Sequence, residues 1–313
     1  MNKQRIVVLG GTGFVGRHMI SRLTADGHSI TLLSRNPNSH SSRFLPPAVA
    51  IKTVNVYDKD KLVAAFSGAD VIINLVGILN ERGDNGRGFQ RAHVELTQTV
   101  IDACQQSDVK RLLHMSALNA GRGHSYYLKS RGEAEKRVKG SGLDWTIFQP
   151  SVIFGVDDGF FNRFAQLLKL TMVLPLARAK ARFAPVYIGD VVEAFVNSLD
   201  QEKTIGRIYE LYGPNIFSLY RIVRLTAAQL HLRRFVLPLP DFLGRIQAWV
   251  CDWIPGKPFS SDNYRSLLTD SVGSVDGLHQ LGIKPTSVEQ VLPEILDVYN
   301  HRQRRLDLYR AGH

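Results

Sequence analysis

The chain has 313 residues, which is long for a single hydrophobic core and suits one large domain with a smaller one appended. Its apolar share of 44% and charged share of 21% are ordinary for a globular protein. Cys104 and Cys251 exclude a disulfide framework and lack the spacing of metal ligands, so we expect reduced thiols in a cytoplasmic protein. The longest uncharged apolar run, residues 71–79, is much shorter than the ~20 residues of a membrane-spanning helix.

The formal net charge of +11 permits an anionic partner, such as a phosphorylated cofactor, acidic lipid, an acidic protein or nucleic acid. The basic residues are scattered along the chain and do not alternate with aromatic residues in a repeat. We therefore do not expect nucleic-acid binding.

A glycine-rich stretch near the start predicts a dinucleotide site. The apolar run 6–9 is typical of a strand buried on both faces, and a helical pattern follows residue 14. Between them, three glycines at a spacing of three allow a tight turn, close approach of a pyrophosphate, and close packing of helix on strand. The helix N-terminus favours the anion. The expected cofactor contacts are Gly10, Thr12, Gly13, Phe14, Val15 and Gly16.

The second predicted strand, residues 29–33, indicates which dinucleotide is bound. Folds selective for NAD place an acid at its end, whereas those selective for NADP place an arginine nearby. Ser34 and Arg35 follow this strand, and no acid occurs from residue 30 to residue 50. The sequence therefore predicts NADP(H), with Arg17 and Arg43 as further candidates for the phosphate site. The alternative for Arg35 is a solvated surface arginine.

Further apolar runs alternate with helical patterns, which predicts a parallel, doubly wound sheet. The expected strands are 51–56, 70–77, 110–116, 143–150 and 207–212. Ligands bind at the carboxyl ends of such strands, so Val76, Gly77 and Pro150 are expected to contact the cofactor. Asp58 is a candidate for the adenine edge or, alternatively, the N-cap of a helix from residue 59.

Two segments beside this edge have open roles. Residues 81–88 contain three glycines and four charged residues, which indicates a mobile loop or substrate lid. An amphipathic helix is expected over 89–104, with His93 on its inner side. A hydrogen-bonded core histidine is the favoured interpretation of His93, and a catalytic histidine is the alternative.

The pattern changes after Gly155. We expect residues 1–155 to form the nucleotide-binding domain, with 185–212 returning to it and Asp190 capping a helix. Residues 156–184 and 213–313 are expected to form a smaller, mainly helical substrate or partner domain. Within it, the Trp-rich stretch 235–255 suits an apolar pocket, a docking surface, a membrane interface, or simply the cover of the smaller core.

These motifs together resemble a family. The glycine turn 10–16, Ser116, the helix start 126–131 and the segments 149–155 and 185–194 resemble a short-chain dehydrogenase of the extended or atypical kind. The stretches 116–118 and 144–147 are most similar to bacterial relatives of the NAD(P)H-binding accessory subunit of mitochondrial respiratory complex I. The likeness covers roughly residues 5 to 215, and it implies a Rossmann fold with a nicotinamide cofactor.

The resemblance also implies a catalytic set, a serine and a Tyr-x-x-x-Lys pair. Ser116 would hydrogen-bond the substrate oxygen and Tyr127 would act as acid–base, but Arg131 stands where the family has lysine. A guanidinium keeps the positive charge of the lysine. Because it does not release its proton, it cannot relay one. This departure puts catalysis in doubt and leaves cofactor binding intact.

Three functions follow from these observations. The first is an NADP(H)-binding accessory protein, docked on a respiratory or quinone-related assembly at the inner face of the membrane. The second is an NADP-dependent oxidoreductase acting on a small, apolar or quinone-like carbonyl or alcohol, with Tyr127 as acid–base. The third, a sugar-nucleotide epimerase or dehydratase, rests on fold analogy alone. We favour the first.

Overall fold

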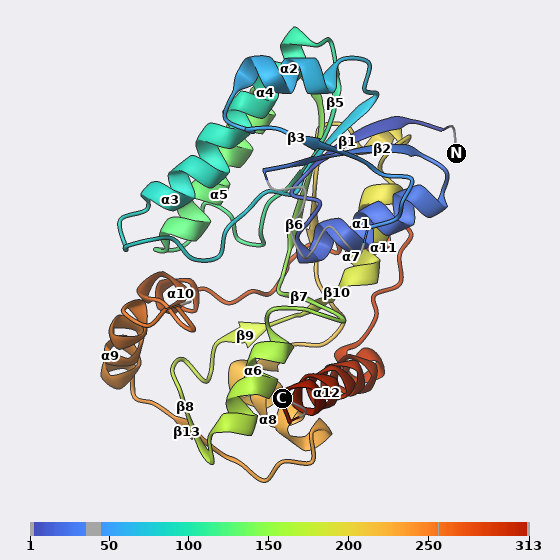
Figure 1. Cartoon of the computed structure of the whole chain (residues 1–313). Coiled ribbons are helices and arrows are strands. Elements are labelled where there is room, and N and C mark those ends of the chain that lie inside the picture. Colours follow the sequence, from blue (N-terminus) through green and yellow to red (C-terminus); the bar gives the residue numbers. More distant parts are fainter. Residues whose placement is uncertain (1–2, 36–44, 256, 312–313) are drawn as a thin grey trace.

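A seven-stranded parallel sheet forms the centre of the upper part of the molecule (Figure 1). The computed structural model describes residues 3–35, 45–255 and 257–311, of which 300–311 are described by their backbone alone. The strand order is β11-β6-β5-β4-β1-β2-β3, and every neighbouring pair is parallel. The strands are β1 (Arg5–Leu9), β2 (Ser29–Ser34), β3 (Ala50–Thr53), β4 (Val71–Asn74), β5 (Arg111–Met115), β6 (Asp144–Pro150) and β11 (Arg207–Leu211). The predicted doubly wound fold is confirmed.

The sheet is covered on both faces because its strands are apolar on both. Ile6 and Val8 join the core under α1 (Phe14–Ala25) and α7 (Ile188–Val196). Val7 and Leu9 alternate to the opposite core, under α2 (Lys59–Phe66), α4 (Leu96–Gln106) and α5 (Tyr126–Lys139). The sheet and these five helices are called the sheet lobe below. The order of strands reverses between β1 and β4, which is where such folds bind ligands.

The helix predicted over 89–104 is divided into three parts. It consists of α3 (Arg87–Phe89), a π-helical segment η2 (Gln90–Glu95) and α4. π-Helical turns are rare and frequently occur at functional sites. Here the turn contains His93, whose side chain is buried.

A second core lies below the sheet lobe and is built mainly by helices (Figure 1). Its members come from α6 (Phe161–Leu170), β8 (Val173–Leu176), α8 (Leu219–Gln229), β13 (Phe235–Pro238) and α12 (Val288–Ala311). With α9 (Asp241–Asp252) and α10 (Ser261–Ser266), these elements are called the helical lobe. The remaining elements are β7 (Ile153–Phe154), β9 (Arg182–Phe183), β10 (Val186–Tyr187), η3 (Glu202–Thr204), β12 (Phe217–Ser218) and α11 (Gly277–Gln280).

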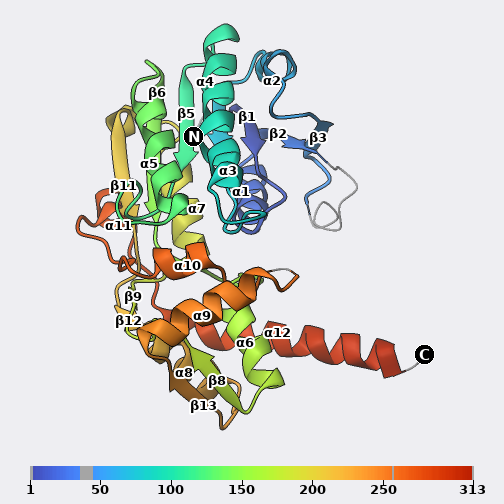
Figure 2. The ribbon, with the colours of Figure 1, turned by 90° about the vertical axis from the view of Figure 1, so that its left-hand side faces the viewer.

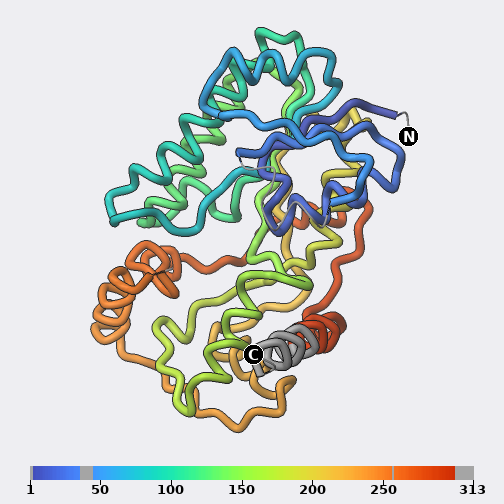
Figure 3. Tube along the Cα trace, viewed as in Figure 1, coloured from blue at the N-terminus to red at the C-terminus, as the bar shows by residue number. Residues whose placement is uncertain are grey.

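The chain passes repeatedly between the two lobes (Figure 3). It leaves the sheet after β6, forms α6 and β8, and returns through β10 and α7 to β11. One expected cap is wrong: Asp190 lies within the first turn of α7, where its carboxylate accepts hydrogen bonds from the N–H and hydroxyl of Thr286 (2.7 and 2.9 Å). Within the described part of the chain, none of the helices combines the length and apolarity required to cross a bilayer.

Candidate functional site

The glycine turn lies at the carboxyl edge of the sheet. Gly10 has φ +81°, and a Cβ there would stand 2.9 Å from the backbone carbon of Leu75, so the turn packs directly on the chain leaving β4. A Cβ on Gly16 would overlap Gly11, which brings α1 close to β1. Gly13 precedes α1 without a side-chain cap, and the first turn carries no acidic residue. The N–H groups and dipole at this helix end therefore suit a pyrophosphate.

This arrangement brings the first six expected cofactor contacts together. Gly10, Thr12, Gly13, Phe14, Val15 and Gly16 form one continuous turn and helix start. The adjacent strand β2 ends at the buried Ser34, and the exposed Arg35 follows. The parallel register of β1 with β2 places both residues beside the turn. Arg17 lies in the first turn of α1, whereas Arg43 is outside the described residues.

Asp58 has a structural role. It is the N-cap of α2, accepts a hydrogen bond from the backbone N–H of Lys61 (3.3 Å) and forms an ion pair with the Lys61 ammonium (2.9 Å). Its hydrogen bonds with the side chain and backbone of Lys61 hold the Asp58 pKa below its ordinary value. The N-cap interpretation is confirmed. The adenine contact stays a prediction.

Arg131 joins the ends of two central strands. Its buried guanidinium donates from Nη1 to the backbone carbonyls of Met115 (3.0 Å) and Val76 (3.3 Å). A Cβ on Gly77 would overlap Nη2 of the same group, so the glycine makes room for the arginine. Charge-assisted bonds to two carbonyls fix the guanidinium between β4 and β5. The contact between Gly77 and Arg131 was not predicted from the sequence.

The other two members of the expected catalytic set lie at the same edge. Ser116 follows β5; its backbone N–H donates to the carbonyl of Phe148 (2.7 Å), and its buried Oγ has no partner among the described residues. Tyr127 lies in the first turn of α5, with the Arg131 guanidinium 5.5 Å from its ring centroid. Pro150 ends β6, and its carbonyl accepts from the N–H of Leu118 (2.9 Å).

His93 holds the backbone around Tyr127 in place. Its Nε2 accepts from the N–H of Ile78 (3.1 Å), so the proton is on Nδ1, which donates to Ser130 Oγ (2.8 Å). The Ser130 hydroxyl in turn donates to the carbonyl of Tyr127 (2.9 Å). Burial, followed by the charges of Arg131 and His114, lowers the pKa of His93 to about 2. The core interpretation of His93 is confirmed.

A second buried histidine was not predicted. His114 of β5 accepts at Nδ1 from the Asn74 side-chain amide (3.3 Å), and burial, followed by the charge of Arg131, lowers its pKa to about 3. Both histidines are thus neutral in the folded protein. Polar residues inside otherwise apolar strand runs were the available signal for Asn74 and His114.

The loop 81–88, expected as a lid, is held by hydrogen bonds within itself and by one from the helical lobe. The buried Glu81 carboxylate accepts from the N–H groups of Asn85, Gly86 and Gly88 (3.0, 2.6 and 2.7 Å). Towards the helical lobe, the Lys257 ammonium donates to the carbonyl of Gly83 (2.7 Å). The loop therefore bridges the two lobes next to the expected site.

Residues of α10 complete the bridge. Arg265 forms ion pairs with Asp84 of the loop and with Asp262 of its own helix. The buried Asp262 carboxylate accepts from the backbone N–H groups of Tyr126 (2.7 Å) and Tyr127 (3.0 Å). A carboxylate is favourable at a helix N-terminus. The start of α5, which carries Tyr127, is thus positioned from the other lobe.

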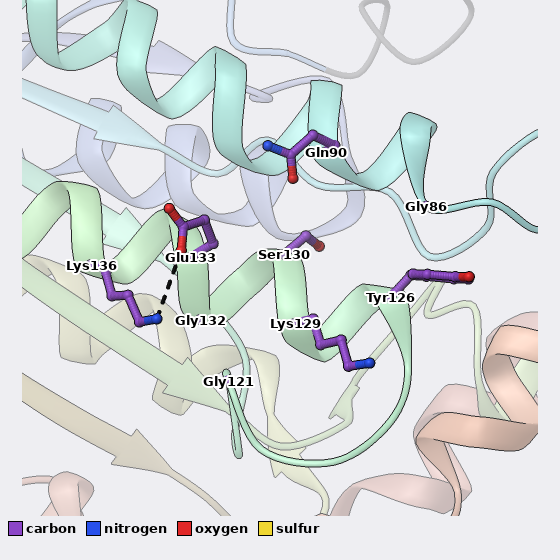
Figure 4. A pocket seen from close by; sticks show the side chains of 9 residues that line it. All are labelled: Gly86, Gln90, Gly121, Tyr126, Lys129, Ser130, Gly132, Glu133 and Lys136. Atoms are coloured by element: carbon purple, nitrogen blue, oxygen red, sulfur yellow. Dashed lines mark ion pairs between the residues drawn. The ribbon is translucent and has the colours of Figure 1, made fainter.

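A pocket of about 400 Å³ lies between α5 and the segment 86–90 (Figure 4). Lys129, Glu133 and Lys136 line it along one side of α5, and an ion pair joins Glu133 to Lys136. Its other lining residues are Gly86, Gln90, Gly121, Tyr126, Ser130 and Gly132. None of the expected cofactor or catalytic residues lines this pocket, so we do not assign the cofactor to it.

Comparisons with known proteins support the nucleotide site. Residues 10–159 match the model of a family described as NAD(P)H-binding. Solved structures share the fold: UDP-glucose 4-epimerase of Thermotoga maritima, bound to UDP-glucose, has a TM-score of 0.76 at 14% identity, covering 96% of this chain and 99% of that one. A dTDP-glucose 4,6-dehydratase of Streptomyces venezuelae with NAD bound has a TM-score of 0.74 at 18% identity, covering 95% and 97%.

Residues 10–159 therefore form a region of the NAD(P)H-binding type, and the chain shares its fold with these epimerases and dehydratases. Among curated proteins, the chain is similar to a subunit of respiratory complex I. It is 28% identical over 302 residues to the mouse protein named NADH dehydrogenase [ubiquinone] 1 alpha subcomplex subunit 9, mitochondrial, covering 92% of this chain and 78% of that protein. The predicted resemblance to the complex I accessory subunit is confirmed.

Proposed function

We propose that this protein holds NADP(H) without transferring hydride, as an accessory protein of a respiratory or quinone-related assembly at the inner face of the membrane. One observation carries the proposal: the residue in the family's lysine position, Arg131, is buried and committed to the carbonyls of Val76 and Met115. The relation to the complex I accessory subunit supports the assembly as partner.

The bound dinucleotide would be held by the glycine turn, with its pyrophosphate at the N-terminus of α1. The lack of a Cβ at Gly10 and Gly13 and the absence of acid in the first turn of α1 fit this anion. Arg35 would meet the 2′-phosphate. The nicotinamide supplies hydride chemistry when bound. On the protein side, the guanidinium of Arg131 stays protonated and fixed, so it takes no part in moving a proton.

We expect NADPH to bind more tightly than NADH, and Arg35→Asp to abolish the difference. Hydrogen bonds to a charged group contribute ~1.5–3 kcal/mol, so the variant should weaken NADPH binding by about 10- to 100-fold and leave NADH binding nearly unchanged. A fluorescence titration measures both. Arg224→Asp, at an exposed position on α8, is the charge-matched control. Equal affinities of the unaltered protein for the two dinucleotides would contradict the NADP assignment.

An oxidoreductase is the second candidate, because the buried Ser116 hydroxyl has no partner among the described residues and lies at the same edge as Tyr127. General acid–base groups contribute ~10²- to 10⁴-fold to rate. Because the proposal includes no hydride transfer, we expect the unaltered chain, Tyr127→Phe and the control Tyr126→Phe to oxidise NADPH at the same background rate when a carbonyl is added. A loss of about 100-fold or more confined to Tyr127→Phe would establish the enzyme instead.

The third candidate, a sugar-nucleotide epimerase or dehydratase, receives only the fold from the solved structures. We further propose that the chain divides functionally near residue 155. Residues 156–184 and 213–313 would then be the part that meets the substrate or partner.

A further inference from the structure

Helix α9 has its small residues inside and its large apolar residues outside. Its buried residues are Gly244 and Ala248. The large apolar side chains on the opposite side are Phe242, Ile246, Trp249, Val250 and, just after the helix, Trp253. Their spacing of three and four residues places them on one face. Trp249 is 61% exposed and Trp253 is 79% exposed.

Contacts of the inner face hold α9 against the rest of the lobe, whereas the large side chains of the outer face take no part in this packing. A Cβ on Gly244 would lie 3.1 Å from Ala177 and 3.2 Å from the ring of Tyr264, so the helix packs closely on the lobe. The Gln247 amide donates to the carbonyl of Pro175 in β8 (3.0 Å). Packing within the chain therefore needs none of the large outer side chains. Exposed apolar surface of this extent marks an interaction site.

The strands next to α9 also carry exposed apolar residues. In the parallel pair β8–β13, Val173 lies opposite Phe235, and both are exposed, as is Leu237. The exposed fraction of Phe235 is 80%. Figure 2 shows α9 across the face of the helical lobe, with β8 and β13 just below it.

Charge indicates what covers this surface. The segments 160–184 and 231–258 together contain nine lysines and arginines and two acidic residues, and one of the nine, Arg182, is paired with Asp270 from outside these segments (2.7 Å). Both acids are paired: Asp241 with Arg178 and Arg245 (each 3.1 Å), and Asp252 with Lys257 (3.6 Å). A second copy of the chain would bring like charge against like charge. An anionic lipid surface instead complements both the basic charge and the tryptophans.

We propose that α9 and the strip β8–β13 dock this protein on an anionic phospholipid surface. Helix α9 lies in the interfacial plane, with Trp249 and Trp253 at the level of the headgroups. Interfacial helices combine such an aromatic face with basic residues around it, and they bind by apolar area together with charge. The inference rests on the peripheral location proposed above, and it names the surface and the lipid class responsible.

Vesicle flotation with the full chain tests the proposal. We expect the protein to float with vesicles of phosphatidylglycerol and phosphatidylcholine, and far less with pure phosphatidylcholine. Retention should fall as salt rises from about 0.1 M to about 1 M, because screening shortens the range of the charge attraction. Absence of retention on the anionic vesicles at low salt would overturn the proposal.

Two double variants distinguish binding through this surface from nonspecific binding by exposed apolar side chains. Trp249→Ala/Trp253→Ala should weaken vesicle binding by about tenfold or more, since the apolar area lost is large. Ile205→Ala/Ile208→Ala instead removes one exposed apolar side chain just before β11 and one within it, and this variant should bind as the unaltered chain does. An equal loss of vesicle binding in both double variants would contradict lipid docking. So would a dimer of the unaltered chain that becomes monomeric only in the tryptophan variant. NADPH titration of the same samples shows separately whether the cofactor proposal holds.

Discussion

Lowering the pH from 7 to 5 is expected to remove about 4 kcal/mol from the free energy of unfolding through His93 and His114 alone. The two side chains are buried, and their folded-state pKa values are lowered to about 2 and about 3. In the unfolded chain each returns to about 6.5. The unfolded state therefore binds more protons below pH 6.5, and stability falls with falling pH.

The sign of this dependence follows from the lowered pKa values. The stabilisation is fully present above pH 6.5 and is progressively lost as the pH falls toward about 3 and about 2. Urea unfolding at pH 7 and pH 5 measures it. Replacing one histidine, in His114→Asn, should reduce the pH-dependent loss by about 2 kcal/mol, although the variant is less stable at pH 7. His124→Asn, at an exposed position, should leave the loss unchanged. An equal loss in all three proteins would show that other groups determine the acid sensitivity.

Gly77→Ala is expected to destabilise the fold by about 1–3 kcal/mol, because the new methyl group would overlap the fixed guanidinium of Arg131. Arg131→Ala alone should cost a similar amount, since it leaves the carbonyls of Val76 and Met115 without their donor. The double variant lacks the overlap. Its loss should therefore be smaller than the sum of the two single losses by about 1 kcal/mol or more.

The matched control is Gly159→Ala, whose Cβ would meet open space and whose φ is not in the left-handed region. We expect its denaturation midpoint to stay close to that of the unaltered chain. Strict additivity of Gly77→Ala and Arg131→Ala would show that the glycine is there for another reason, such as the approach of the cofactor.

The sheet could be predicted because its signals are local. The inner strands are mainly apolar runs of a few residues, and the edge strands β3 and β11 mix apolar and polar residues. The intervening helical patterns leave few alternatives to a parallel order. The glycine turn is equally local, since three glycines at a spacing of three, Gly10, Gly13 and Gly16, both make the turn and mark the anion site. Its position beside β2 then follows from the fold.

The surroundings of Tyr127 could not be predicted, because they come from contacts distant in sequence. Spacing placed Arg131 one helical turn from Tyr127, but its burial against β4 and β5 decides where the guanidinium points. Likewise, no local pattern links His93 to Ile78 and Ser130. The Trp-rich stretch was visible as composition. Only the structure shows that Gly244 and Ala248 face inward and the tryptophans outward.

The carboxylate of Asp262 limits how this chain could be shortened or recombined. It supplies acceptors for the N–H groups of Tyr126 and Tyr127 from more than 130 positions downstream. A fragment that ended before α10 would contain all seven strands yet begin its α5 without that acceptor. If the nucleotide-binding part were fused to a different domain, the glycine turn would stay intact. The start of α5 at Tyr127 would lose its hydrogen bonds to Asp262. The two lobes are therefore not interchangeable modules, because a substitution at residue 262 acts on a helix in the other lobe.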